Sequence, residues 1–293
     1  MKAAPFTLHR PATVEEAVSL MARYAEDGGL VLAGGQSLTP MMALRVAYPP
    51  HLVDINNVAG LDSLTAGEGY FGIGATVRHA RFHRPVPEAG RLGEVLATVV
   101  RHIAHYPIRQ RGTFCGSLAH ADPASEWCLV AATLDADLRL VGEGGERLVP
   151  VSEFIDGAMS TVREPEEILV EARLPLLAKE VRFGFYEFNR RAGDFALGMA
   201  LVVYDLDGGV MRNVRVGLGG IEEKARRIGV AEAALEGQAA SAEAFAAAAA
   251  ATVDDVEAME DATTSQAYRR DLSGVVVRRA LEASLDTDTR GTE

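Results

Sequence analysis

Two glycine-rich segments are the parts of this sequence most suited to binding chemistry. The first runs from Leu32 to Leu38 and contains Gly34 and Gly35, and the second runs from Arg111 to Glu126 and combines glycine with hydroxyl side chains. Neither segment contains lysine, so we expect backbone N–H groups to bind an anion there. Two such loops in one chain predict a site for a long, phosphate-bearing ligand such as a dinucleotide.

The composition limits the partners of the chain. Its 293 residues include 29 Lys and Arg against 41 Asp and Glu, a net charge of −12 at pH 7. This balance disfavours nucleic acid and anionic membrane surfaces as partners. No apolar run reaches the roughly 20 residues that a membrane-spanning helix needs, and the first ten residues do not resemble a signal peptide. We expect a cytoplasmic protein that binds a small molecule or another protein.

The reactive side chains predict neither a metal site nor a catalytic acid or base on this chain. The two cysteines, Cys115 and Cys128, cannot supply the four thiolates of an iron–sulfur cluster or a structural zinc. Their spacing is not Cys-x-x-Cys, so we expect small buried thiols. Two pairs of histidines have helical spacing but lack the glutamate of a zincin motif. Arg109 and Arg111 lie at the start of the second segment. Their charges would either neutralise the diphosphate or face a partner subunit.

The elements around the two segments are predicted to bring them together. Thr13 and Glu16 fit a capping box, and the apolar positions after them predict an amphipathic helix. Residues 30–33 are predicted to form a strand, and the first glycine segment follows its carboxyl end, where open α/β sheets bind ligands. A further strand is predicted over residues 51–55. A helix over residues 91–105 leads into the second segment.

The pattern of apolar residues changes near residue 176. Before this point short strands alternate with helices, and after it long strands and tight turns precede alanine-rich helices. We predict a first domain of residues 1–176, with subdomains 1–56 and 57–176, and a second domain of residues 177–286. The polar residues 287–293 are expected to form a frayed tail. The second domain is predicted to contain strands over residues 181–188, 197–204 and 210–218 and helices over residues 229–235, 241–256 and 266–284.

Four motifs in order resemble one protein family. They are Ala33-Gly34-Gly35-Gln36-Ser37-Leu38-Thr39-Pro40, the stretch from Leu44-Arg45 to Val53-Asp54-Ile55, Arg111-Gly112-Thr113 with Gly116-Ser117-Leu118-Ala119-His120-Ala121-Asp122-Pro123-Ala124, and Arg190-Arg191 with Asp194-Phe195-Ala196. The pattern resembles the medium, FAD-binding subunits of molybdenum hydroxylases. That family includes the medium subunits of carbon monoxide dehydrogenase and of quinoline- and nicotine-type dehydrogenases, and the flavin domain of xanthine dehydrogenase. The likeness covers roughly residues 3–285.

The resemblance implies an α+β fold class. A two-part N-terminal FAD-binding α+β domain of the vanillyl-alcohol-oxidase type (VAO/PCMH-like) would precede a C-terminal antiparallel sheet with helices. Non-covalent FAD would lie extended between them. The cofactor-binding residues that the resemblance implies are Ala33, Gly34, Gly35, Gln36, Ser37, Leu38, Ile103, Thr113, Cys115, Gly116, Ser117, His120, Asp122, Glu126, Leu169, Phe195 and Arg212.

The resemblance also implies what these residues do. The amides of the two loops would wrap the diphosphate, which agrees with the glycine content. Glu126 would bind sugar or ribityl hydroxyls, Ile103 and Leu169 would line the flavin, and Phe195 would cover one face of it. Arg212 would place a cation near the ring.

One position departs from the family pattern. Cys115 stands where relatives usually have the first glycine of a Gly-Gly pair. If this position needs positive φ, a cysteine would cost on the order of 1 kcal/mol or more. We therefore expect weaker FAD binding or a shifted loop.

The resemblance implies an electron-transfer subunit of a larger enzyme. A large subunit with a molybdenum–pterin centre would hydroxylate the substrate, and a small subunit would carry two [2Fe–2S] clusters. The three kinds of subunit would assemble as a dimer of heterotrimers. FAD on this chain would pass the electrons to an external acceptor. Carbon monoxide, an aldehyde, a nitrogen heteroaromatic or a purine all remain compatible as substrate.

Two alternatives belong to other classes of protein. A self-contained FAD oxidase or dehydrogenase of the vanillyl-alcohol-oxidase type uses related Gly-Gly loops, although such enzymes are usually longer and have a substrate-capping domain. A non-catalytic FAD-binding or nucleotide-binding module would hold the flavin without being reduced by a partner.

Overall fold

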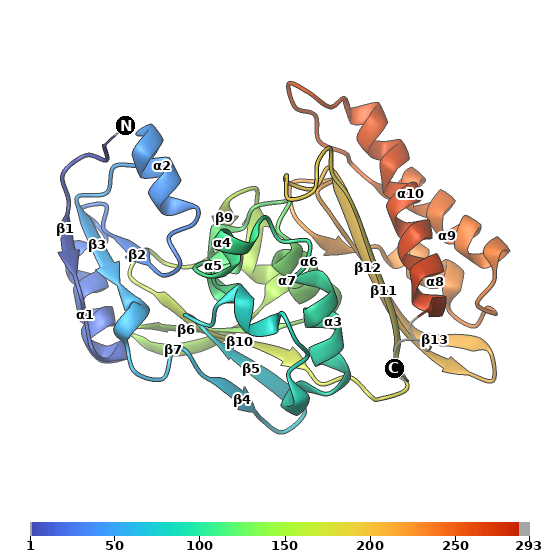
Figure 1. Cartoon of the computed structure of the whole chain (residues 1–293), viewed down its shortest axis with the longest axis horizontal. Coiled ribbons are helices and arrows are strands. Elements are labelled where there is room, and N and C mark those ends of the chain that lie inside the picture. Colours follow the sequence, from blue (N-terminus) through green and yellow to red (C-terminus); the bar gives the residue numbers. More distant parts are fainter. Residues whose placement is uncertain (1, 287–293) are drawn as a thin grey trace.

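The computed structural model describes residues 2–286, which form three parts arranged in chain order (Figure 1). An N-terminal part carries a parallel sheet, a middle part carries a larger antiparallel sheet, and a C-terminal part carries long antiparallel strands covered by helices. The α+β class is therefore confirmed. The tail predicted over residues 287–293 lies outside the described residues. Among residues 2–286, no helix is long and apolar enough to cross a membrane.

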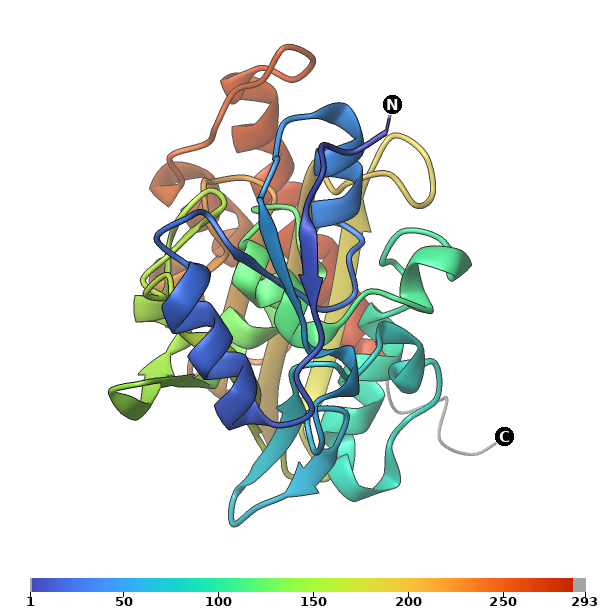
Figure 2. The same cartoon turned by 90° about the vertical axis from the view of Figure 1, so that its left-hand side faces the viewer.

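The N-terminal part is a three-stranded parallel sheet in the order β1-β3-β2, which lies in front of the middle part in Figure 2. Helix α1 begins as predicted, since Thr13 Oγ1 accepts a hydrogen bond from the Glu16 N–H. Glu16 Oε2 accepts from the Ala12 N–H at 2.7 Å, one residue before the cap. The elements are β1 (Thr7–His9), α1 (Val14–Tyr24), β2 (Leu30–Leu32), α2 (Leu38–Leu44), β3 (His51–Asp54) and the 3-10 turn η1 (Ile55–Asn57).

The middle part is a five-stranded antiparallel sheet in the order β4-β5-β10-β6-β7. Its helices include α6, which is buried along almost its whole length. The strands of this sheet are β4 (Leu64–Ala66), β5 (Tyr70–Gly74), β6 (Asp137–Gly142), β7 (Gly145–Pro150) and β10 (Ile168–Pro175). A separate two-stranded sheet pairs β8 (Ile155–Gly157) with β9 (Ser160–Thr161). The helical elements are η2 (His79–Phe82), η3 (Pro87–Ala89), α3 (Arg91–Val99), α4 (Tyr106–Arg109), α5 (Phe114–His120), α6 (Glu126–Thr133) and α7 (Val151–Phe154).

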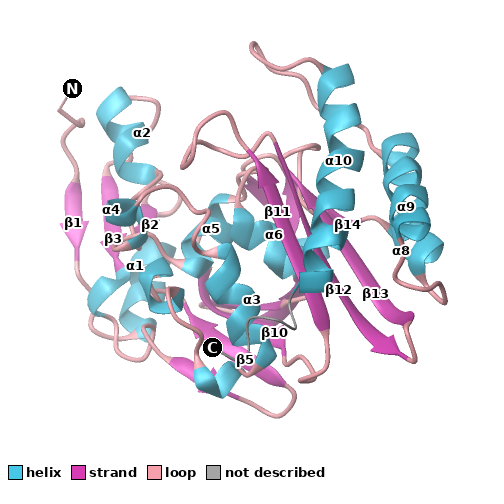
Figure 3. Ribbon diagram, turned by 45° about the vertical axis from the view of Figure 1, so that its right-hand side comes forward, coloured by secondary structure: helices cyan, strands magenta, loops and turns pink. Residues whose placement is uncertain are grey.

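The C-terminal part is a four-stranded antiparallel sheet in the order β11-β12-β13-β14. Helices α8 to α10 lie on one side of it and α6 on the other (Figure 3). Gly184 in β11 allows α10 to approach closely, because a Cβ there would lie 2.6 Å from the Ser284 nitrogen. The elements are β11 (Arg182–Phe188), β12 (Gly198–Asp207), β13 (Val210–Gly219), β14 (Arg226–Arg227), α8 (Gly229–Leu235), α9 (Ala242–Asp255) and α10 (Gln266–Leu285).

Strand β12 is buried on both faces, because successive side chains point to opposite sides of a strand. Met199, Leu201 and Val203 belong to the hydrophobic core of the N-terminal and middle parts, whereas Ala200 and Val202 pack into the core under α8 to α10. The larger core therefore extends past residue 176. The division of the chain at residues 176/177 stays a prediction.

The long periodic elements were predicted well, and the turns around the ligand segments were not. The strands and helices expected after residue 177 lie within three residues of their predicted ends. The helix predicted over residues 91–105 ends at Val99, and Ala104 has a φ of +42°, which a continuing helix does not allow. The segment Arg111–Glu126 is not one loop, because it contains α5 and the first residue of α6.

Candidate functional site

The two glycine segments meet at one cavity of about 700 Å³, which is within the usual size of cofactor sites. All three parts of the chain contribute to its lining. The N-terminal part provides β2 and the loop before α2, the middle part provides α5 and the start of α6, and the C-terminal part provides Gly193 to Phe195. Of the cofactor-binding residues expected from the sequence, all but Arg212 line this cavity.

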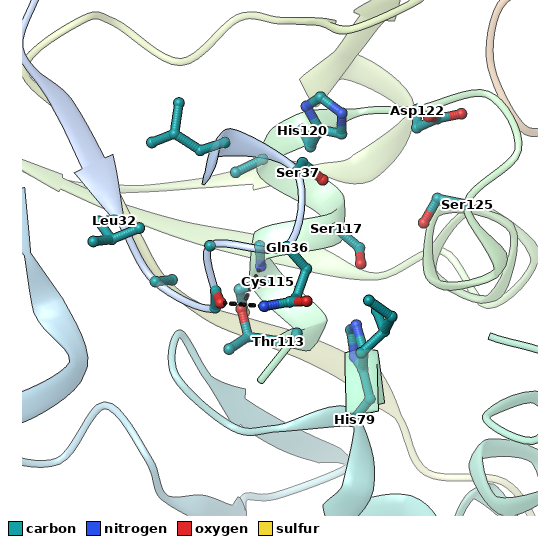
Figure 4. Close-up of a pocket in the computed structure, with 18 of the residues that line it drawn as sticks. Leu32, Gln36, Ser37, His79, Thr113, Cys115, Ser117, His120, Asp122 and Ser125 are labelled. Carbon is teal, nitrogen blue, oxygen red and sulfur yellow. Dashed lines mark hydrogen bonds between the residues drawn. The ribbon is translucent and has the colours of Figure 1, made fainter. Parts of the chain in front are cut away.

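Gly34 and Gly35 fit the first loop for different reasons. A Cβ on Gly34 would lie 2.4 Å from the carbonyl oxygen of Arg111 and 2.8 Å from Cα of Gly112, so the two loops touch where Gly34 has no side chain. Gly35 has a φ of +72°, a conformation that favours glycine. The side chain of Gln36 folds back and donates to the Gly34 oxygen at 3.2 Å (Figure 4).

Two side chains that the sequence analysis did not single out connect the loops. Asn56 Nδ2 donates to the carbonyl of Ala33 at 2.8 Å, and its Oδ1 accepts from Nη2 of Arg78 at 2.5 Å. Nη1 of Arg78 donates to the carbonyl of Arg111 at 2.5 Å. Burial, with the nearby charge of Arg111 as a second cause, lowers the pKa of Arg78. We name Asn56 and Arg78 the loop bridge.

Backbone N–H groups point to an anion as the ligand. Within residues 2–286, the N–H groups of residues 34–38 have no hydrogen-bond acceptor, nor does that of Cys115 in the first turn of α5. Thr113 caps α5, since its Oγ1 accepts from the Gly116 N–H at 3.0 Å. Free amides beside glycine suit a diphosphate, and the donor set therefore fits the dinucleotide expected from the sequence.

Polar side chains continue the wall beyond the amides. Figure 4 shows Ser37 on the first loop and Ser117 of α5 beside that loop, with His120, Asp122 and Ser125 further along. Asp122 Oδ1 accepts from the Ala124 N–H at 2.8 Å and so fixes the turn before α6. These groups suit hydroxyls of a sugar or ribityl chain.

Apolar side chains also line the cavity. Ile103 and Leu169 are buried in the cavity wall, whereas Phe195 is 75% exposed on the segment between β11 and β12. Gly193 has a φ of +87°, and a Cβ there would lie 2.2 Å from the His105 ring, so this segment rests on the turn before α4. Phe195 is free to pack against a ligand that enters the cavity.

His79 is a buried neutral histidine at the edge of the site. Its Nδ1 accepts from Nε1 of Trp127 at 2.8 Å. Burial, followed by the charges of Arg109 and Arg78, lowers the pKa of His79 to about 3. The ring is therefore neutral at neutral pH.

Two basic residues do not have the positions that the sequence suggested. Arg212 lies on β13, paired with Asp205 in β12 near the turn at Asp207, and it does not line the cavity. Its strand brings it to the opposite end of the sheet from Phe195, so the structure does not bring Arg212 to the cavity with the other residues expected from the sequence. Arg109 donates to the carbonyls of Ile103 and Ala104 and to His83, so its guanidinium holds the turn after α3.

The strain expected at Cys115 is absent. Cys115 is the second residue of α5, it is not among the residues with positive φ, and its Sγ lies 3.3 Å from the Ile73 carbonyl. The thiol is buried, and burial raises its pKa far above the usual range. The condition on which weaker binding or a shifted loop was expected, a positive φ at Cys115, is therefore not met, because a helical position accepts a cysteine.

We expect Cys115→Gly to destabilise the chain without improving FAD binding. The change removes a buried side chain and places glycine in a helix, so the free energy of unfolding should fall by about 1 kcal/mol or more. Urea unfolding of the full chain measures this loss, and Cys115→Ala separates the lost thiol from the effect of glycine. A stabilised or more tightly binding glycine variant would restore the idea of strain.

Comparisons with known proteins agree along most of the chain. Residues 4–177 match the family described as the FAD binding domain in molybdopterin dehydrogenase, and residues 183–284 match the CO dehydrogenase flavoprotein C-terminal domain. The carbon monoxide dehydrogenase medium chain of Hydrogenophaga pseudoflava is 35% identical over 280 residues, which cover 95% of this chain and 96% of that protein. The nicotine 6-hydroxylase medium subunit of Paenarthrobacter nicotinovorans is 34% identical, with coverages of 92% and 94%.

Solved structures show the same fold. A chain of carbon monoxide dehydrogenase from Hydrogenophaga pseudoflava has a TM-score of 0.92 at 35% identity, and it covers 97% of this chain and 99% of its own length. A chain of quinoline 2-oxidoreductase from Pseudomonas putida 86 has the same TM-score and coverages at 33% identity. The resemblance inferred from the four motifs is therefore confirmed: this chain belongs to the family of medium, FAD-binding subunits of molybdenum hydroxylases, which are oxidoreductases.

Proposed function

We propose that this chain binds FAD non-covalently in the 700 Å³ cavity and transfers electrons between a partner subunit and an external acceptor. The observation that supports this most is the meeting of the two glycine loops at Gly34, with amides on both loops that have no acceptor among residues 2–286. Bound FAD supplies a centre that can take up and release electrons.

The residues of the chain would bind and orient the cofactor. The N–H groups of residues 34–38 and of Cys115 are our candidates for the diphosphate. Ser117, Asp122 and Glu126 are candidates for its hydroxyls, and Ile103, Leu169 and Phe195 for the flavin ring. Phe195 is exposed enough to shield the ring from water once the cofactor is in place.

The partners in this proposal are an iron–sulfur small subunit and a molybdenum large subunit, assembled as a dimer of heterotrimers. The two cysteines of the chain are buried free thiols, too few for a cluster, so clusters must lie on another subunit. We place the complex in the cytoplasm, where thiols stay reduced. Related subunits belong to enzymes named for carbon monoxide, nicotine and caffeine, and we assign the choice of substrate to the large subunit.

Purification of the full chain tests the proposal directly. The protein should show the absorption bands of oxidised flavin, or gain them when FAD is added, and acid should release the flavin intact. A chain that stays colourless with excess FAD would contradict the assignment. Flavin that remains attached after acid treatment would contradict the non-covalent part of it.

A further inference from the structure

The segment of residues 78–111 gives this acidic chain a basic surface. It contains seven arginines, no lysine and only two acidic residues, in a chain whose net charge is −12. The segment includes η2, η3, α3 and α4 and the turns between them. Four of its arginines are exposed, namely Arg81, Arg84, Arg101 and Arg111. The charge of this surface is therefore opposite to that of the chain as a whole.

Contacts between these elements bring arginines of the segment together. Helix α4 packs against η2, and Nε of Arg109 in α4 donates to Nε2 of His83 at 3.0 Å. Nη1 of Arg109 donates to two carbonyls of the turn after α3, which carries Arg101, at 2.7 and 2.9 Å. Arg84 follows His83 directly, and the ring of Tyr106, which is 61% exposed, lies 5.9 Å from the His83 ring. We name Arg84, Arg101, Arg109 and Tyr106 the basic surface.

The positive charges of the basic surface are not neutralised by the described part of the chain. Within residues 2–286, no ion pair includes Arg84, Arg101 or Arg109. The guanidinium of Arg109 is bound to an imidazole and to carbonyls, not to a carboxylate. Elsewhere in the chain arginine pairs with carboxylates, as Arg139 does with Glu146 at 3.0 Å. The basic surface therefore keeps its charge available for a partner.

The basic surface lies next to the cavity. Ile108, two residues after Tyr106, lines the cavity, and so does His105, the residue before it. A Cβ on Gly193 would lie 2.2 Å from the His105 ring, so the segment that carries Phe195 rests on the same turn. A protein bound to the basic surface would lie beside the end of the cavity that we assign to the flavin ring.

We propose that the basic surface is the docking site of the external electron acceptor, and that this acceptor is a small one-electron carrier protein with an acidic surface. The inference rests on the proposed function, because only a chain that holds FAD has electrons to pass on. Encounters between electron-transfer proteins use small interfaces, and opposite charges speed such encounters. Arginine and tyrosine are also the side chains that contribute most to protein interfaces.

Other occupants fit the basic surface less well. The net charge of −12 repels nucleic acid and anionic membranes from the chain as a whole. A permanent subunit would bury arginines that have no carboxylate partner within residues 2–286, whereas permanent interfaces are mainly hydrophobic. An acidic protein that binds and leaves again matches both the charge and the exposure of the surface.

The transfer itself needs no chemical group from the basic surface. Two encounters with an oxidised carrier remove both electrons from reduced FAD, each carrier gains one electron, and the protons that FAD loses go to water. The basic surface acts before this step, because it raises the rate at which carriers arrive in a productive orientation.

The test measures how salt affects electron transfer to an acidic carrier. The full chain loaded with FAD is reduced with one equivalent of dithionite without oxygen and mixed with oxidised, acidic plastocyanin, and stopped-flow absorbance gives the second-order rate constant. Overall repulsion between two acidic proteins would make this constant rise with salt, whereas attraction by the basic surface makes it fall. We expect a fall of at least about threefold between about 0.01 M and about 0.15 M salt.

Charge-reversal variants assign the effect to the basic surface. Arg101→Glu should slow the reaction with plastocyanin at low salt at least about fivefold, and it should not slow the reaction with cytochrome c, which is basic. Arg270→Glu is the matched control, because it changes the net charge equally at an exposed position on α10, on the side of the C-terminal sheet away from α6 (Figure 3). Its rate constants should stay close to those of the wild type. Arg84→Glu serves as a second test variant if Arg101→Glu does not fold.

Several results would overturn the docking site. A rate constant for plastocyanin that rises with salt, or equal slowing by Arg101→Glu and Arg270→Glu, would mean that the basic surface does not bind the carrier. A folded Arg101→Glu chain that no longer co-purifies with its partner subunits would assign the surface to the permanent complex. Duplex DNA or phosphatidylglycerol vesicles that bind the wild type but not Arg101→Glu would assign it to another polyanion. A chain that binds no FAD would instead overturn the proposed function.

Discussion

Gly34→Val should abolish FAD binding at micromolar concentrations of cofactor. A Cβ at this position would lie 2.4 Å from the Arg111 oxygen and 2.8 Å from the Gly112 Cα, and both are backbone atoms that cannot rotate away. The two loops must then separate, and the N–H groups of residues 34–38 no longer lie beside those of α5. We expect at least about a 100-fold weaker dissociation constant, equivalent to about 2.7 kcal/mol, from fluorescence titration.

The control for this variant is another glycine in a turn. Gly144 lies in the turn between β6 and β7 and has no neighbouring atom within 4 Å of a built Cβ, so Gly144→Val should bind FAD as the wild type does. Circular dichroism should show that both variants are folded. Normal FAD affinity in folded Gly34→Val would contradict the contact between the loops as the basis of the site.

The loop bridge gives the second prediction. Asn56→Ala removes the bond to the Ala33 carbonyl, and Arg78→Gln removes the bond to the Arg111 carbonyl, so each frees one loop from the other. We expect about tenfold weaker FAD binding for each single variant, or about 1.4 kcal/mol. Because the two side chains act through one hydrogen bond, the double variant should lose clearly less than the product of the two effects.

An exposed arginine in the same region serves as the control. Arg10 has a side chain that is 67% exposed and lies 3.9 Å from Asp54, so Arg10→Gln removes a positive charge near the loops without breaking the bridge. Its FAD affinity should stay close to the wild type. If Arg10→Gln and Arg78→Gln lost the same amount of FAD affinity, the affinity would depend on the positive charge near the loops and not on the loop bridge. Strict additivity in the double variant would mean that the two residues act independently.

The glycine loops could be predicted from the sequence because their function depends on local features. Gly34 and Gly35 follow a strand that its apolar residues predict. The property that suits them to the site, the lack of a side chain, follows directly from the residue type. The long strands after residue 181 were predicted for the same reason, since alternation along a strand does not depend on distant residues.

The loop bridge could not be predicted in this way. Asn56 and Arg78 are 22 residues apart, so only tertiary packing brings them together. The one local signal for Asn56 was its position: it is a polar residue just after β3, at the carboxyl end of the sheet, where ligands bind. The helical state of Cys115 was missed because glycine-rich segments read as loops, although Thr113 is a good cap.

The double burial of β12 limits how proteins of this architecture can exchange parts. Consider a C-terminal part that is taken from a relative and joined to the N-terminal and middle parts of this chain. One face of its β12 must pack against its own helices α8 to α10. The other face, which carries Met199, Leu201 and Val203 in this chain, must pack against the middle part of the recipient. A recombination point between residues 176 and 181 therefore divides the sequence at a convenient turn but cuts through a single packed interior. Chimeric subunits should fold only when both faces of that one strand come from compatible parents.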